Sequence, residues 1–200
     1  DPTLVILEDG KLRVFFTYMV GSRQFSEATP SIASATSDDG IHFTRDPGIR
    51  FAIEDTPTID CSAAKVGDMW HLVCPVMEGG STRAYHATSS DGLSFTRRED
   101  LSGDMRWLGC MVAVKGGVEF YGSRGPKMRG VGLPVAWSPD ALDWMGPTAI
   151  RVSGADPGVV YLPDGSRVAV VTGRARAGTA SDRREPQRRQ RPAPLVTPPR

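Results

Sequence analysis

The sequence lacks an excess of charge of either sign. Its 200 residues carry 24 Lys and Arg against 23 Asp and Glu, a formal net charge of +1. The charges are unevenly placed, because residues 174–200 hold eight Arg against one Asp and one Glu. Residues 1–173 are therefore mildly acidic, and we expect no nucleic-acid partner for them.

Long apolar runs are also missing. No stretch approaches the roughly 18 apolar residues that cross a bilayer, and no basic and then apolar leader is present, so we expect no membrane partner. The chain starts without Met, at Asp1 and Pro2. We interpret it as a fragment of a longer product whose targeting signal lies elsewhere.

Cysteine is scarce. The chain has an odd number of cysteines, Cys61, Cys74 and Cys110, and their spacing matches no metal-binding or redox motif. We expect three small buried residues in strands, with one disulfide between two of them as the open alternative. No acidic loop of the calcium-binding kind is present either, so the sequence predicts no metal and no cofactor.

What the sequence does contain is an internal repeat. Residues 35–43 (ATSDDGIHF) match residues 87–95 (ATSSDGLSF) at an offset of 52, and residues 136–144 (AWSPDALDW) form a weaker copy 49 residues later. Each copy predicts a hairpin: a strand that ends in Ser, a tight Asp-Gly turn, and a second strand that an aromatic residue begins. The Ser and Asp side chains can bond the amides of the turn itself, so we interpret the motif as structural.

A second unit precedes each hairpin. Residues 1–16 and 156–171 share an Asp-Pro start and a Gly-containing turn nine residues later, and residues 60–73 and 109–121 are more divergent copies. One period of about 50 residues therefore holds four short antiparallel strands, which is typical of a β-propeller blade. The fold class predicted is all-β, with about three and a half blades in residues 1–173. A β-sandwich is the alternative, but it gives no reason for the repeat.

Residues 174–200 break this pattern. They are rich in Arg and Pro and contain almost no large apolar side chain. Such a segment cannot bury enough surface to offset the entropy lost on ordering. We therefore expect a solvated, disordered tail.

Three aspartates occupy the repeated position at which an innermost strand begins: Asp1, Asp60 and Asp156. In a propeller these strand starts face one channel mouth, so we expect the three carboxylates to converge. Glycoside hydrolysis needs such a set, with one acid to protonate the leaving oxygen and one base to activate water. The alternative role for each is to begin a strand and to bond amides of the adjacent loop.

These motifs resemble the five-bladed propeller glycoside hydrolases, a superfamily that includes arabinanases, xylosidases, levansucrases and invertases. The resemblance covers residues 1–173 and implies an Asp base, a second Asp that orients substrate, and a Glu acid. Asp1 matches the first and Asp60 the second. The strand that begins near residues 107–110 has no acidic residue, whereas Glu119 lies on the following strand and Asp104 in the preceding loop.

Other side chains near these strand starts are candidates for substrate binding. Trp107 and Tyr121 can stack on the apolar face of a sugar, with core packing as the alternative. Arg124 can bond hydroxyls or a carboxylate. His71 and His86 lie within strand patterns, and we expect them to be packed rather than catalytic.

The sequence therefore predicts a glycoside hydrolase that acts on oligo- or polysaccharides. A non-catalytic propeller that binds carbohydrate or protein is the main alternative, and a sialidase-like propeller is a third. The sialidase repeat carries one more residue between Ser and Gly than residues 37–40 do, which disfavours it. We expect a monomer that works in an extracellular or periplasmic compartment.

Overall fold

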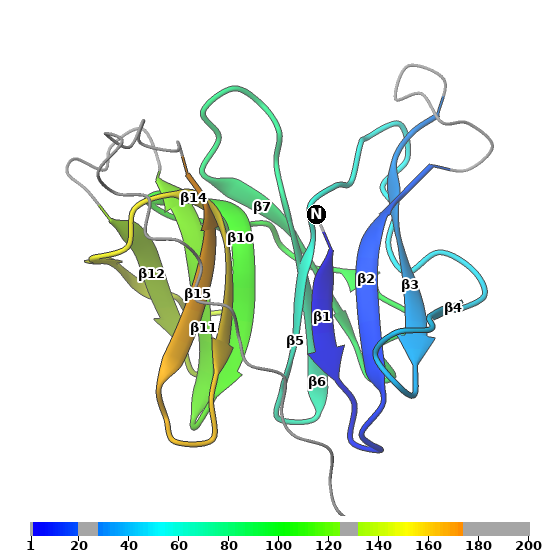
Figure 1. Ribbon diagram of the computed structural model, residues 1–200. Coiled ribbons are helices and arrows are strands. Elements are labelled where there is room, and N and C mark those ends of the chain that lie inside the picture. The colour runs from blue at the N-terminus through cyan, green and yellow to red at the C-terminus, as the bar shows by residue number, and fades with distance from the viewer. Residues whose placement is uncertain (1, 20–27, 125–131, 174–200) are drawn as a thin grey trace, which may run out of the picture.

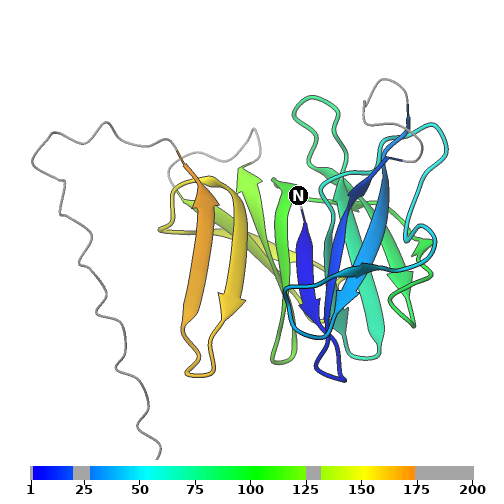
Figure 2. The ribbon, with the colours of Figure 1, turned by 45° about the vertical axis from the view of Figure 1, so that its right-hand side comes forward.

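The computed structural model describes residues 2–19, 28–124 and 132–173. Within these ranges the chain forms strands and no helix, so none of the described segments is an apolar helix able to cross a membrane. Antiparallel sheets follow one another along the chain and stand side by side (Figures 1 and 2). The predicted all-β class is confirmed. The predicted tail lies outside the described residues.

The sheets are blades with simple up-and-down order. Blade 1 comprises β1 (Thr3–Ile6), β2 (Leu12–Tyr18), β3 (Ser31–Ser37) and β4 (Thr44–Arg45). Blade 2 comprises β5 (Ser62–Val66), β6 (Met69–Pro75), β7 (Arg83–Ser89) and β8 (Thr96–Arg97), with β9 (Leu101–Ser102) also paired to β7. Blade 3 comprises β10 (Met105–Val114), β11 (Gly117–Arg124), β12 (Leu133–Ser138) and β13 (Met145–Ile150). A half-blade follows, made of β14 (Ala155–Tyr161) and β15 (Arg167–Thr172).

The repeated hairpin closes each blade by the local bonds expected from the sequence. In blade 1, Ser37 Oγ accepts from the Gly40 amide at 2.9 Å, and Asp39 Oδ1 accepts from the Ile41 and His42 amides at 2.9 and 2.8 Å. Ser89 and Asp91 in blade 2, and Ser138 and Asp140 in blade 3, cap their own turns through the same side chains. The structural interpretation of this motif is confirmed.

The core lies between the blades. Phe15 and Ile32 of blade 1 pack with Trp70 and Leu72 of blade 2 in one buried cluster. A second cluster joins blades 2 and 3. Because each sheet buries its face only against the next sheet, apolar burial holds the blades in order.

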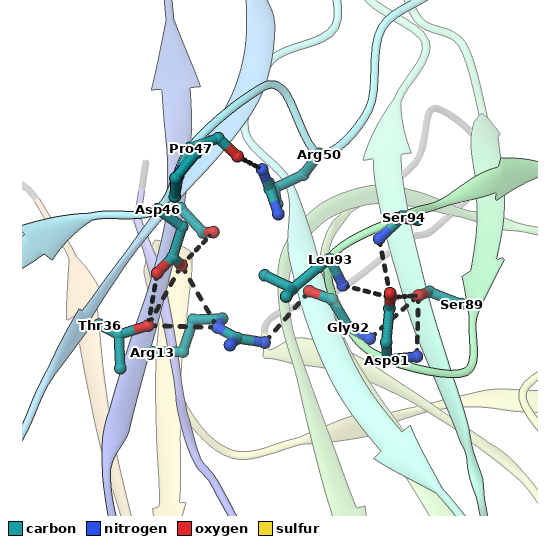
Figure 3. Close-up of polar contacts among 11 residues, drawn as sticks. Arg13, Thr36, Asp46, Pro47, Arg50, Ser89, Asp91, Gly92, Leu93 and Ser94 are labelled. Carbon is teal, nitrogen blue, oxygen red and sulfur yellow. Dashed lines mark hydrogen bonds and ion pairs between the residues drawn. The ribbon is translucent and has the colours of Figure 1, made fainter.

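Polar side chains also connect neighbouring blades, at the end where the repeated hairpins turn. Arg13 of β2 approaches Asp46 of its own blade, with 3.4 Å between Nε and Oδ2, and donates from Nη1 to the Gly92 carbonyl of blade 2 at 3.3 Å (Figure 3). Asp46 also accepts from the hydroxyls of Ser34 at 2.6 Å and Thr36 at 2.9 Å. Arg13 thus holds the turn of the next blade in place.

Blade 2 carries a different polar pair at the same level. His71 pairs with Thr88 across the sheet as Arg13 pairs with Thr36. The rings of His71 and His86 stack, with His71 Nδ1 and His86 Nε2 at 3.0 Å. Both residues are buried, in agreement with the expectation that they are packed.

Candidate active site at the channel mouth

The innermost strands of the four sheets are β1, β5, β10 and β14, and each contacts the next one around the channel. Residues at or near one end of these strands surround a cavity of about 260 Å³, to which β10 contributes Gly109 and Cys110 from its middle. The cavity is lined by Pro2, Thr3, Cys61, Gly109, Cys110, Asp156, Pro157, Gly158 and Thr172. Of the three aspartates expected to converge, Asp156 lines this cavity.

Asp60 and Asp156 begin their strands with the same unusual backbone. Their φ angles are 51° and 48°, in the left-handed region that Asp and Asn tolerate better than most side chains. The Asp60 amide donates to Thr17 Oγ1 of blade 1 at 3.2 Å, and Asp60 directly precedes Cys61 in the cavity wall. Both aspartates therefore share a backbone conformation near the starts of β5 and β14.

Asp1 lies outside the described residues. Its neighbour Pro2 is part of the cavity wall. The expected role of Asp1 therefore stays a prediction.

Gly109 occupies the equivalent position in blade 3, and its surroundings exclude a side chain. Its φ is 154°, and a Cβ atom there would lie 1.9 Å from the carbonyl oxygen of Tyr121. The space that a carboxylate would need is thus filled by the backbone of β11. In this arrangement no acidic side chain fits at the position where the resemblance implies one.

The two cysteines at the mouth have thiols of raised pKa. Burial raises the pKa of the Cys61 thiol to about 12 and that of Cys110 to about 11, so both thiols stay protonated near neutral pH. All three cysteines are free, and the disulfide alternative is not found. Among the described residues, no group of three His, Cys, Asp or Glu is placed to hold a metal ion.

Trp107 lies in the core rather than at the mouth. It is 2% exposed, its ring packs edge-on against Phe120 and Trp144 at centroid distances of 4.9 and 5.1 Å, and its Nε1 donates to the Thr82 carbonyl at 3.1 Å. No open ring face is left for a sugar in this arrangement. The structure supports core packing, the alternative that the sequence left open.

Tyr121 and Glu119 form a polar clamp between blade 3 and the half-blade. The Tyr121 hydroxyl donates to Glu119 and accepts from Arg167 Nη1 at 2.7 Å, while the Tyr161 hydroxyl donates to Glu119 at 2.7 Å. Burial and the hydrogen bond to Glu119 raise the pKa of Tyr121. These partners belong to β11, β14 and β15, so both side chains are occupied in holding the blades together.

Arg124 is the last residue of β11 and is exposed. It pairs with Met105 across the sheet and is not among the residues that line the mouth cavity. Of the candidates that the structure describes, Asp156 lines the mouth cavity, Asp60 precedes Cys61 in its wall, and the side chains of Trp107, Tyr121 and Arg124 do not line it.

Neither a family model nor a curated protein matches the sequence. The fold, however, is similar to that of a family 117 glycoside hydrolase from the marine bacterium Zobellia galactanivorans, with 16% identity and a TM-score of 0.63 over 89% of this chain and 63% of that chain. It is also similar to the family 32 β-fructofuranosidase of Bombyx mori, solved as a mutant in complex with sucrose, with 15% identity and a TM-score of 0.54 over 82% and 40% of the two chains.

A further similar structure comes from work on family 130 of mannoside phosphorylases and its glycoside hydrolases, with 18% identity and a TM-score of 0.52 over 86% of this chain and 51% of that chain. The chain spans about half the length of the solved structures it matches. At these identities the likeness concerns the fold. The predicted resemblance is confirmed at that level: the chain has the four-stranded-blade β-propeller fold that these glycoside hydrolases share.

Proposed function

We propose that this chain belongs to a propeller glycoside hydrolase that cleaves oligo- or polysaccharides with carboxylates at the channel mouth. The observation that carries the proposal is the cavity to which residues of the four innermost strands or their leading segments contribute, with Asp156 in its wall and Asp60 next to Cys61. Carboxylates from separate blades can then act on one glycosidic bond. Asp1 is the proposed base and Asp60 the proposed substrate-orienting residue.

The general acid has to come from elsewhere in the protein. Gly109 leaves no room for a side chain at the equivalent position of blade 3, and Glu119 is engaged by two tyrosines. The proposal therefore assigns the acid to a residue outside the described ranges. We also propose that the protein acts as a monomer in an extracellular or periplasmic compartment, where polysaccharide substrates are found.

Gly109 also favours a second candidate function, a propeller that binds carbohydrate without cleaving it. Such a protein keeps the mouth cavity and the strand-start aspartates but has no need of a general acid. The two candidate functions both predict that the protein binds sugar, but only the hydrolase cleaves it.

Replacement of Asp60 by Asn in the full-length protein tests the proposal. Asn tolerates the left-handed backbone of residue 60, so we expect an unchanged thermal midpoint and a loss of hydrolysis of about 100-fold or more. Activity is measured on a panel of aryl glycosides and oligosaccharides. Asp55→Asn is the matched control, because Asp55 has a φ of 53° but lies in an exposed turn away from the cavity.

Three outcomes separate the candidates. Unfolding of the Asp60→Asn protein assigns Asp60 to strand initiation and contradicts the catalytic role. Undiminished hydrolysis contradicts it as well. Sugar binding that depends on Asp60, together with no turnover by the unmodified protein, supports the binding propeller.

A further inference from the structure

Arg50 is a buried cation that lacks a partner of opposite charge within the described ranges. The residue is 6% exposed. Its guanidinium donates from Nη2 to the Pro47 carbonyl, its Nε has no acceptor, and it forms no ion pair with a described residue. A guanidinium taken out of water is stable only when its charge and its N–H groups are matched.

The charges around Arg50 leave its own charge unbalanced. The carboxylates of Asp46 and Asp91 stabilise the charged form of Arg50, whereas the cations of Arg13 and Arg45 destabilise it. Burial is the larger effect and lowers the pKa of Arg50. The formal charges of these two carboxylates and two guanidinium groups sum to zero, so the positive charge of Arg50 remains as the surplus.

The two nearby acids are committed to other groups. Asp46 accepts from the hydroxyls of Ser34 and Thr36 and lies beside Arg13. Asp91 Oδ1 accepts from Ser89 Oγ and from the amides of its own turn. Figure 3 shows Arg50 between these two groups and bonded to neither.

Arg50 lines a cavity of about 560 Å³ between blades 1 and 2. The wall consists of Asp46, Pro47, Ile49, Arg50, Asp91, Leu93, Ser94 and Phe95. This cavity shares no lining residue with the cavity at the channel mouth. It is therefore separate from the channel mouth.

We propose that this cavity binds a small molecule through a single carboxylate group, with Arg50 as its principal contact. The two oxygens of a carboxylate match the N–H groups of a guanidinium, and one negative charge balances the surplus. Leu93 and Phe95 offer apolar contact to the rest of the ligand. A doubly charged phosphate or sulfate fits less well, because Asp46 and Asp91 share the wall. The inference does not depend on the proposed function.

Titration of the full-length protein with glucuronate, glucose, acetate and inorganic phosphate, at constant ionic strength, tests this site. The readouts are isothermal titration calorimetry and the NMR signal of the Arg50 Nε–H group. We expect glucuronate and acetate to bind and to shift that signal, glucose to do neither, and phosphate to bind more weakly than the carboxylates. If acetate binds more strongly than glucuronate, the site recognises the carboxylate group alone, and the proposal is still supported.

Arg50→Met removes the proposed contact, and Lys115→Met is the control because it removes an exposed charge from a turn of blade 3 that does not line the cavity. We expect Arg50→Met to weaken glucuronate binding by about tenfold or more and Lys115→Met to leave it nearly unchanged. Equal binding of glucose and glucuronate, tighter binding of phosphate, or no shift of the Arg50 signal in the unmodified protein would each overturn the proposal. The NMR measurement decides the matter even if Arg50→Met does not fold.

Discussion

The residue that turns each hairpin needs a left-handed backbone, and the chain meets this need in two ways. Gly40 and Gly92 have φ angles of 73° and 67°. The third copy has Ala141 at this position, and its φ of 63° shows that the turn keeps its shape with a less suitable residue. The Ser and Asp bonds of the motif hold the turn in both cases.

We predict that Gly92→Ala destabilises the fold more than Gly10→Ala does. Both glycines have positive φ, so each substitution costs about 1–2 kcal/mol of conformational energy. A Cβ atom at Gly92 would also lie 2.9 Å from the Trp70 ring and 3.1 Å from Arg13 Nη1, whereas Gly10 has nothing within 4 Å. Urea unfolding of both variants measures the difference. Equal free energies of unfolding would contradict the steric part of the argument.

Blades 2 and 3 are joined at the level of their innermost strands by one buried hydrogen bond. The Met111 amide of β10 donates to Ser62 Oγ of β5 at 2.6 Å, and Ser62 is almost fully buried. A side chain of one blade thus satisfies a main-chain donor of the next. Neighbouring elements of the propeller are linked by such specific bonds as well as by apolar packing.

Ser62→Ala is expected to lower the free energy of unfolding by about 1–3 kcal/mol, because it leaves the buried Met111 amide without an acceptor. Ser102→Ala, at an exposed position of β9, is the control and should change it by less than about 0.5 kcal/mol. Chemical denaturation gives both values. A loss for Ser62→Ala no larger than that of the control would show that water replaces the hydroxyl.

The stability of the whole molecule is expected to depend on pH through the histidine pair of blade 2. Burial, with the nearby charges of His71 and Arg98, lowers the pKa of His86 to about 4, and burial lowers the pKa of His71 against the opposing effect of Asp140. An unfolded histidine has a pKa of about 6.5. The unfolded chain therefore binds more protons than the folded one between these values.

We predict that the free energy of unfolding is highest above about pH 6.5 and falls by about 1–3 kcal/mol as the pH decreases toward 4. Thermal unfolding measured across this range tests the prediction. His86→Phe should flatten the slope. His42→Gln should keep it, because the His42 side chain is 86% exposed. A slope that survives the loss of His86 would assign the pH dependence to other groups.

The blade repeat was predictable because its determinants are local. Ser37, Asp39 and Gly40 bond one another within three residues, and the same spacing recurs at Ser89 and Ser138. Strand number, turn positions and the all-β class follow from such short-range bonds and from the period of the repeat. The same periodicity predicted that Asp156 lies at the end of its blade where the mouth cavity is found.

The roles of single side chains depended on partners that are distant in the chain. Trp107 donates to a carbonyl 25 residues away, and Tyr121 accepts from Arg167, 46 residues away. The absence of a side chain at Gly109 is imposed by the backbone of β11, and the unbalanced charge of Arg50 arises where two blades meet. Periodicity specifies which residues share a level, but only the packing of one blade on the next decides what each side chain touches.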